Sequence, residues 1–330
     1  MWFTLPGRSG ASAHRGSAAV KRQRRVLAVL VVLAVALLGA CRTNAPVTVQ
    51  TTTLRLPCAG GTTVGARWAL PTDVAPLGVV YLQHGFARSA ARVDDVARSI
   101  AARGLAVVSP DLSGFGSCSI NESATRAAVA DLLDGQGTDG LQASADRARA
   151  AAGLAPTPLP TAVVLAGHSA GGALVTAAAA RLATDPSSAV RQRLRGVVLL
   201  DPVETSDRAM AAALPALRST SVLTVSAPAG ACNASGSGTA ALVAARTGFA
   251  GVRLPTGCHC DAEADSTDAL CTLVCGTPKA GNEAALKRLA ADWADDMARG
   301  RRVDGEPYPG GGWFESQRGA GTVVALTGTA

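Results

Sequence analysis

Short apolar runs alternate with longer alanine-rich runs along most of this chain. The apolar runs are rich in Val, Leu and Ile, which predicts buried strands, and the runs between them have the length and spacing of helices. The predicted strands are residues 78–83, 105–109, 162–166, 196–200, 222–226 and 251–254. This alternation is typical of an α/β fold in which helices cover both faces of a mostly parallel central sheet.

The two ends of this pattern predict further elements. Residues 48–56 and 63–70 predict a hairpin at an antiparallel edge of the sheet, which Pro71 ends. Residues 283–299 predict a long helix, and residues 322–326 predict a last short strand. Because no change of composition divides the chain after residue 53, we predict a single domain over residues 54–330.

The first forty residues follow a different pattern. A basic run at residues 21–25 precedes an uninterrupted apolar stretch at residues 26–40, which is the order of an export signal. The stretch is short for a helix that spans a bilayer. It ends in Leu-Gly-Ala-Cys, which resembles the lipobox of bacterial lipoproteins and implies that Cys41 is acylated and begins the mature chain.

We therefore predict a lipoprotein signal peptide over residues 1–40, and a lipidated Cys41 with a polar tether over residues 41–53. The acyl chains would anchor the domain to the extracytoplasmic face of the cell membrane. Two alternatives stay open: cleavage by an ordinary signal peptidase, which gives a secreted protein, and retention of the apolar stretch as an anchor helix. All three export the domain.

The net charge does not indicate a nucleic-acid partner. The formal charge is +7, but six of the 31 basic residues precede Cys41, in a region without acidic residues. The remaining chain is close to neutral and only 3% of all residues are aromatic. It lacks both the basic surface and the stacking side chains that nucleic-acid binding requires.

Eight cysteines in an exported chain predict disulfides. If Cys41 carries lipid, an odd number remains, so at least one stays unpaired. Spacing does not fix the pairing, although the density between Cys232 and Cys275 predicts that the C-terminal loops are joined. A metal site at Cys258, His259, Cys260, Cys271 and Cys275 is an alternative, but these spacings are not CxxC knuckles, so we predict no metal and no cofactor.

The candidate nucleophile is Ser169, within Gly-His-Ser-Ala-Gly at residues 167–171. This G-x-S-x-G follows the predicted strand 162–166 and opens the helical run 172–182. A strand, a tight turn and a helix are the setting of a nucleophile elbow, which lifts the serine hydroxyl clear of the sheet.

The serine needs a base, and the chain has four histidines. His14 lies in the signal, His84 lies in an early loop, and His168 precedes the serine, where we expect its side chain to point elsewhere. His259 remains, and it follows the last parallel strand. It is the predicted base.

The imidazole needs a carboxylate, and the chain between Ser169 and His259 offers Asp185, Asp201, Glu204 and Asp207. Asp185 is expected at the far edge of the sheet. Asp201 directly ends the predicted strand 196–200 and is the favoured acid, with Glu204 as the alternative.

Stabilisation of an oxyanion needs backbone N–H groups that are fixed in advance. Ala170, after the nucleophile, supplies one. The second is expected from the loop after strand 78–83, where we choose Phe86 and place Ala87 next. His84 is then expected to brace this loop.

Together the segments His-Gly-Phe (84–86), Pro-Asp-Leu-Ser-Gly-Phe-Gly (110–116), Gly-His-Ser-Ala-Gly and the late histidine resemble the α/β-hydrolase superfamily over residues 77–299. Leu-Asp-Pro-Val at 200–203 and Cys-His-Cys-Asp at 258–261 are similar to the chlorophyllase and dienelactone-hydrolase-like branch. In that branch the acid follows the sixth strand, which implies a triad of Ser169, Asp201 and His259. Polyester and cutinase-like hydrolases place the acid after the seventh strand, where this chain has Ala-Pro-Ala-Gly. The resemblance supports the mechanism, and we do not predict chlorophyll as substrate.

These features predict an exported serine hydrolase that cleaves carboxylic esters with an apolar portion through an acyl-enzyme. The segment after Asp201 is too short for a large lid domain. Its apolar residues Met210, Leu214 and Leu217 either line an acyl pocket or belong to the core. The expected partners are a small-molecule or lipid-like ester and, through the anchor, the membrane; we expect a monomer. A non-catalytic binding lipoprotein with this fold, and an acyltransferase or thioesterase with the same triad, are the alternatives.

Overall fold

The computed structural model describes residues 1–4, 44–58, 60–135, 140–301 and 304–330. The basic and apolar runs of the predicted signal and Cys41 lie outside these residues. The chain divides into two compact units, Met1–Thr43 and Asn44–Ala330. Among the helices that the structure describes, none combines the length and the apolar character that crossing a membrane would require.

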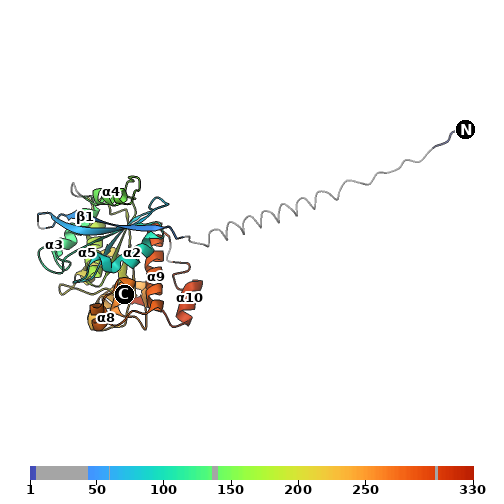
Figure 1. Ribbon diagram of the computed structural model, residues 1–330. Coiled ribbons are helices and arrows are strands. Elements are labelled where there is room, and N and C mark those ends of the chain that lie inside the picture. Colours follow the sequence, from blue (N-terminus) through green and yellow to red (C-terminus); the bar gives the residue numbers. More distant parts are fainter. Residues whose placement is uncertain (5–43, 59, 136–139, 302–303) are drawn as a thin grey trace. The chain divides into compact units, whose positions relative to one another are not determined.

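Within Asn44–Ala330, nine described strands form one sheet in the order β1-β2-β4-β3-β5-β6-β7-β8-β9 (Figure 1). The strands from β3 to β8 are parallel, while β1, β2 and β9 run antiparallel at the two sides. Their bounds are β1 Val47–Leu56, β2 Thr62–Pro71, β3 Val79–Gln83, β4 Ala106–Pro110, β5 Val163–His168, β6 Leu194–Leu200, β7 Ser221–Ser226, β8 Thr247–Arg253 and β9 Val324–Thr329. The predicted α/β fold with a mostly parallel sheet is confirmed.

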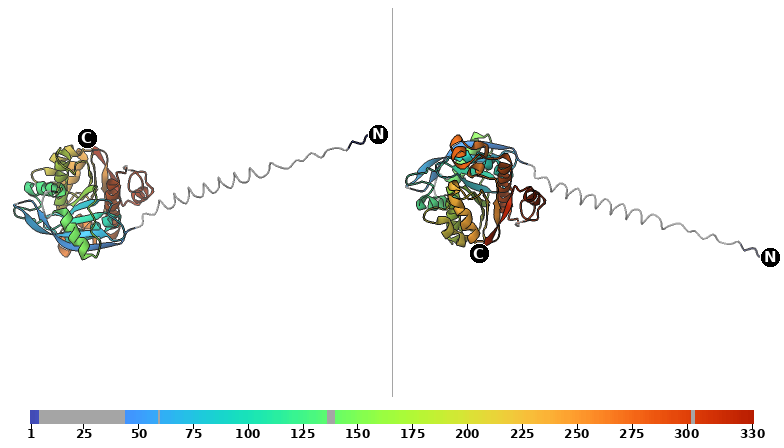
Figure 2. Two further views of the ribbon diagram at one scale, coloured as in Figure 1. Left: turned by 90° about the horizontal axis from the view of Figure 1, so that it is seen from above. Right: turned by 90° about the horizontal axis from the view of Figure 1, so that it is seen from below.

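Helices cover both faces of the sheet (Figure 2). One face carries α3 (Ser123–Leu133), α4 (Leu141–Ala151), α5 (Ala170–Thr184), α6 (Ala209–Ala213) and α7 (Ser237–Ala244). The other carries α2 (Asp94–Ala101), α9 (Ala280–Ala298) and α10 (Gly312–Gly319). A short helix, α8 (Ala269–Cys275), and the 3-10 turns η1 (Ala90–Val93), η2 (Leu214–Leu217), η3 (Ala231–Gly236), η4 (His259–Ala262) and η5 (Ala264–Ser266) complete the described helical elements.

Each face of the sheet has its own hydrophobic core. Along β3, Val80 and Leu82 belong to the core under α2 and α9, while Tyr81 belongs to the opposite core, as the two-residue period of a strand requires. All members of both cores belong to Asn44–Ala330. This unit therefore contains the apolar contacts that it needs to fold by itself.

The structure departs from the predicted pattern at several element boundaries. β1 spans Val47–Leu56, in agreement with the predicted strand over residues 48–56, so the tether predicted over residues 41–53 is too long. β9 spans Val324–Thr329, later than the predicted residues 322–326. β8 begins at Thr247, before the predicted residue 251, because a bulge between Phe249 and Gly251 interrupts the alternation of apolar side chains. Met210, Leu214 and Leu217 are fully buried in the core, which excludes the acyl-pocket reading of these residues.

Candidate active site

Ser169 lies at a sharp turn between β5 and α5. Its backbone has φ of 56° and ψ of −127°, a region that L residues rarely adopt. Glycines allow the turn: a Cβ on Gly167 would lie 2.4 Å from the Gly171 carbonyl oxygen, and one on Gly171 would lie 2.5 Å from the Gln83 carbonyl oxygen. The predicted nucleophile elbow is thus present in the backbone.

The three residues that the sequence singled out come together at the carboxyl ends of the parallel strands. The Ser169 hydroxyl lies 2.9 Å from His259 Nε2 and donates to it when Nδ1 carries the ring proton. His259 Nδ1 lies 2.6 Å from Asp201 Oδ2 and donates to it in that tautomer. Asp201 directly follows β6, and His259 begins η4 after β8. This arrangement can activate a serine for nucleophilic attack.

Asp201 is held by donors that the sequence analysis missed. Its Oδ1 accepts the Ala227 N–H at 3.0 Å, and Nδ2 of Asn233 lies 3.2 Å from each carboxylate oxygen. Asn233 is buried, and its own Oδ1 accepts the N–H groups of Gly230 and Gly236. An asparagine in a glycine-rich loop after β7 was the available signal, but its partner is fixed only by the tertiary fold.

Glu204, the alternative acid, binds backbone N–H groups and not the imidazole. Its carboxylate accepts the backbone N–H groups of Thr205, Met210 and Ala211, which stabilises the start of α6. Asp201 is therefore the carboxylate that contacts the imidazole.

The expectation that His168 points elsewhere is wrong, because its ring packs against that of His259 at 4.7 Å between centroids. Its Nε2 donates to the His259 backbone carbonyl at 3.0 Å. Burial holds the pKa of His168 well below 6.5, so the ring is neutral and carries its proton on the donating nitrogen. His168 thus holds the loop that carries His259.

The loop after β3 approaches Ser169 closely. A Cβ on Gly85 would lie 2.9 Å from Ser169 Cβ, so only glycine fits there. In the described part of the chain, the N–H groups of Phe86 and Ala170 have no hydrogen-bond acceptor and remain free for a ligand. Ala87, the second choice, has φ of 54°. These positions suit an oxyanion hole.

His84 braces the same loop. Its Nδ1 donates to the Gly85 carbonyl at 2.8 Å, and its Nε2 accepts the Leu112 N–H at 3.1 Å. Burial lowers the pKa of His84, which keeps the ring neutral and lets Nε2 accept. The ring therefore ties the loop after β3 to the loop after β4.

An ion pair joins the loop after β3 to the segment that follows His259. The Arg88 guanidinium binds the buried Glu263 carboxylate through Nε and Nη2, and Nη1 lies 3.1 Å from Asp268. Asp268 also binds Arg92 at 3.0 Å. A two-point guanidinium–carboxylate contact fixes orientation as well as distance, so these two loops are held in register.

Ser169 opens into a cavity of about 800 Å³. Its lining includes the apolar side chains of Leu270 and Val274 of α8, which are 65% exposed, and of Phe86. It also includes polar side chains, among them Asn121, Ser123, Ser206 and Asp207. A cavity of this size accepts a small organic molecule, and this mixed lining suits an amphiphilic one.

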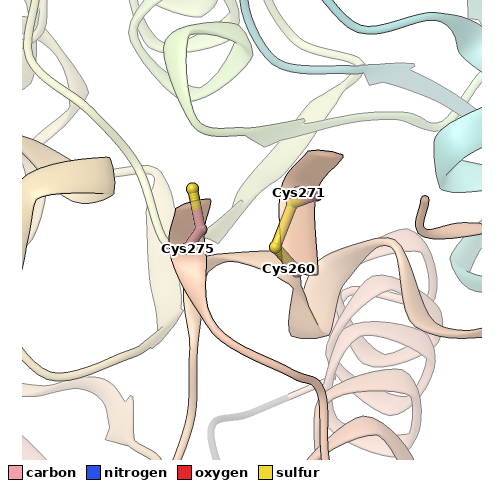
Figure 3. Close-up of side chains that lie close together, drawn as sticks. All are labelled: Cys260, Cys271 and Cys275. Atoms are coloured by element: carbon pink, nitrogen blue, oxygen red, sulfur yellow. A yellow bond between two sulfur atoms is a disulfide. The ribbon is translucent and has the colours of Figure 1, made fainter. Parts of the chain in front are cut away.

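Two disulfides hold α8 against the site. Cys260, next to His259, is bonded to Cys271, and Cys275 is bonded to Cys232, next to Asn233. A third disulfide joins Cys58 and Cys118, and Cys258 is a free thiol whose pKa burial raises to about 12. Figure 3 shows the sulfur atoms of Cys260, Cys271 and Cys275 close together, and they lie within 4.8 Å of one another.

Such a cluster has the ligand types of a metal site. All three sulfurs are engaged in disulfides, however, and metal ligation requires thiolates. The residues as they stand do not fit a metal ion.

The strand order, the elbow at Ser169 and the contacts among Ser169, His259 and Asp201 are typical of the α/β-hydrolase fold. A family model described as "Serine aminopeptidase, S33" matches residues 74–235. This match and the fold support membership of the α/β-hydrolase superfamily.

Among solved structures, the esterase domain of a Rhodothermus marinus protein is similar, with 17% identity and a TM-score of 0.46, over 74% of this chain and 98% of that one. No curated protein matches the chain.

Proposed function

We propose that this protein is an exported serine hydrolase that cleaves carboxylic esters through an acyl-enzyme on Ser169. The observation that carries the proposal is the continuous hydrogen-bond chain from Asp201 through His259 to the Ser169 hydroxyl, which ends in the wall of the 800 Å³ cavity. Each of the three side chains is positioned by a different strand end, so the contact is not a consequence of local sequence.

In the first half-reaction, Ser169 Oγ attacks the ester carbonyl carbon and gives its proton to His259 Nε2. Asp201 stabilises the imidazolium that forms. The negative charge on the carbonyl oxygen is received by the N–H groups of Phe86 and Ala170, which are free in advance. Collapse of this intermediate breaks the bond to the alcohol, which leaves with the proton from His259, and the acyl group stays on Ser169.

In the second half-reaction, water gives a proton to His259 Nε2 and attacks the acyl carbon. A second tetrahedral intermediate forms in the same oxyanion hole. Its collapse releases the carboxylic acid and returns the proton to Ser169 Oγ. Bonds formed and broken balance over the cycle, and no cofactor is needed.

The acid after β6 supports a place near the chlorophyllase and dienelactone-hydrolase-like branch. The apolar side chains of Leu270, Val274 and Phe86 in the cavity lining support a substrate with an apolar portion. We also propose the location: Cys41 is lipidated and anchors the domain on the extracytoplasmic face of the membrane, and the disulfides suit that oxidising compartment.

The test is hydrolysis of a chain-length series of chromogenic acyl esters by residues 42–330, made under oxidising conditions. Ser169→Ala and His259→Ala should each lower kcat/KM on the order of 10⁴-fold or more while the protein stays folded. Asp201→Asn should also lower kcat/KM severely. Glu204→Gln is the matched control, because its carboxylate caps α6, and it should retain activity. If the folded protein shows no turnover and a fluorophosphonate does not label Ser169, the binding-protein alternative replaces the enzyme.

A further inference from the structure

A second hollow, of about 470 Å³, lies between α2, α9 and the first residues of the folded unit. Four of the side chains that line it are basic: Arg98, Arg103, Lys287 and Arg288. We call these four residues the basic patch. Asn44 and Ala45 line the same hollow, and the Ala45 N–H donates to the Ala102 carbonyl, which fixes the start of the domain beside the patch.

The basic patch has a net positive charge. Among the described residues, Asp292 is the carboxylate that forms ion pairs with the patch, 2.8 Å from Arg103 and 3.5 Å from Arg288. In the described part of the chain, Arg98 and Lys287 form no ion pair with any carboxylate. Arg98 is exposed and Lys287 is half-buried. At least two cations are therefore available to an external anion.

Acidic side chains gather further along the same two helices. Asp95 comes one helical turn before Arg98, and Glu283 one turn before Lys287. After burial, the charges of Asp265, Asp261 and Asp95 raise the pKa of Glu283, while Lys287 of the patch attracts the carboxylate and lowers it. Charge is thus separated along the α2 and α9 pair, with the cations on the side of Asn44.

The segment between Cys41 and Asn44 limits how far the basic patch lies from Cys41. Asn44 follows Cys41 by three residues, and an extended chain spans at most about 3.6 Å per residue, so the two are separated by no more than about 11 Å. That distance is comparable with the Debye length at physiological ionic strength. A lipid on Cys41, which is part of the proposed function, would hold the patch within electrostatic reach of the headgroups.

We propose that the basic patch binds the anionic phospholipid headgroups of the membrane and sets the orientation of the domain. Arg98 and Arg103 lie at the end of α2 that leads into the amino end of β4, whereas Ser169, Asp201 and His259 follow the carboxyl ends of their strands. The catalytic cavity therefore opens on the other edge of the sheet and faces away from the lipid. The substrate would then reach the site from the surrounding medium.

The experiment measures co-sedimentation of residues 42–330 with vesicles, so that no lipid anchor contributes. The vesicles are phosphatidylcholine alone or about three parts phosphatidylcholine to one part phosphatidylglycerol, in about 50 mM and about 500 mM salt. We expect binding to the anionic vesicles at low salt, and little to the neutral ones. Arg98→Gln with Lys287→Gln should weaken this binding about thirtyfold, because each removed cation costs about fivefold in affinity.

The matched control removes two exposed arginines at the other end of β1, Arg55→Gln with Arg147→Gln. Arg55 lies about 26 Å along the strand from Val47, and this variant should bind as the unchanged domain does. Hydrolysis of a soluble ester should be the same in all three proteins. Vesicle binding is measured independently of hydrolysis, so it tests the patch even if the protein has no esterase activity. Absence of salt-sensitive binding by the unchanged domain, or equal weakening in both variants, would overturn the proposal.

Discussion

Asn233 affects the site through another residue, Asp201. Its amide nitrogen lies 3.2 Å from both oxygens of Asp201, and Asp201 is the carboxylate that orients His259. The Asn233 amide oxygen is fixed by two backbone N–H groups, so the NH₂ group must face Asp201. Asn233 is therefore a positioning residue for the acid.

Asn233→Asp tests this role with almost no change of shape. The new carboxylate keeps one oxygen for the backbone donors and places the other about 3.2 Å from Asp201. Two carboxylates at that distance share a proton, which raises the pKa of the pair. We expect the acidic limb of the kcat/KM profile to move upward by about one pH unit or more. Asn233→Ala, which brings no second carboxylate, should lower stability and kcat without that displacement, and an unmoved limb in the Asp variant would contradict the role.

His168 links the site to stability at acidic pH. Its folded pKa lies well below 6.5 because the ring is buried, whereas the unfolded ring titrates near 6.5. As the pH falls below 6.5, the unfolded state therefore takes up a proton that the native state does not. The free energy of unfolding should fall by up to about 1.4 kcal/mol per pH unit from this group alone.

His168→Gln removes that titration and keeps an N–H donor for the His259 carbonyl. Denaturant unfolding at several pH values between 5 and 8 should show the two proteins diverging in slope only below about pH 6.5, with the histidine protein the steeper. Parallel curves over the whole range would count against this account.

At the scale of elements, α8 joins two loops of the site through its disulfides. Cys260–Cys271 holds the turn that begins with His259, and Cys232–Cys275 holds the loop that contains Asn233. Both contacts act on the same short helix. Breaking one of these bonds should therefore disturb the site more than it disturbs the fold.

The pair Cys232→Ser with Cys275→Ser can be compared with Cys58→Ser and Cys118→Ser. The bonds close loops with separations of 43 and 60 residues, so chain entropy predicts a similar loss of stability, about 4 kcal/mol in each case. We expect only the first variant to lose kcat/KM well beyond its loss of folded protein, by about tenfold or more. Activity assays at a temperature where both variants are folded give the measurement, and equal activity in the two would refute the link.

The sequence predicted most elements because their burial pattern is local. The parallel strands are short and apolar, and Ser169, Asp201 and His259 each follow one directly or in the next loop. β8 was placed too late because Gly248 and the bulge at Gly251 interrupt its pattern. The roles of His168 and Asn233 depend on which loops meet in space, and neither residue has a spacing that reveals its partner.

At the scale of the whole molecule, the domain places its chemistry and its charge on different sides. The cavity beside Ser169 lies at the carboxyl ends of the parallel strands, and the basic patch lies beside Asn44, near the amino end of β4. The separation of the cavity from the basic patch affects how the domain is oriented only if the chain is held at a membrane. The proposed lipid on Cys41 is therefore the feature to test at this scale.

Cys41→Ala tests the anchor in the full chain, expressed in a bacterium that processes lipoproteins. If Cys41 is acylated, the unchanged protein should sediment with membranes and enter the detergent phase, because two or more acyl chains give stable anchoring. The variant should lose the lipid mass. A variant chain that remains in the membrane with residues 26–40 uncleaved would instead identify an anchor helix, and release of both proteins into the medium would identify ordinary secretion. Ester hydrolysis should be equal in the two proteins, since Cys41 lies outside the compact unit that carries the site.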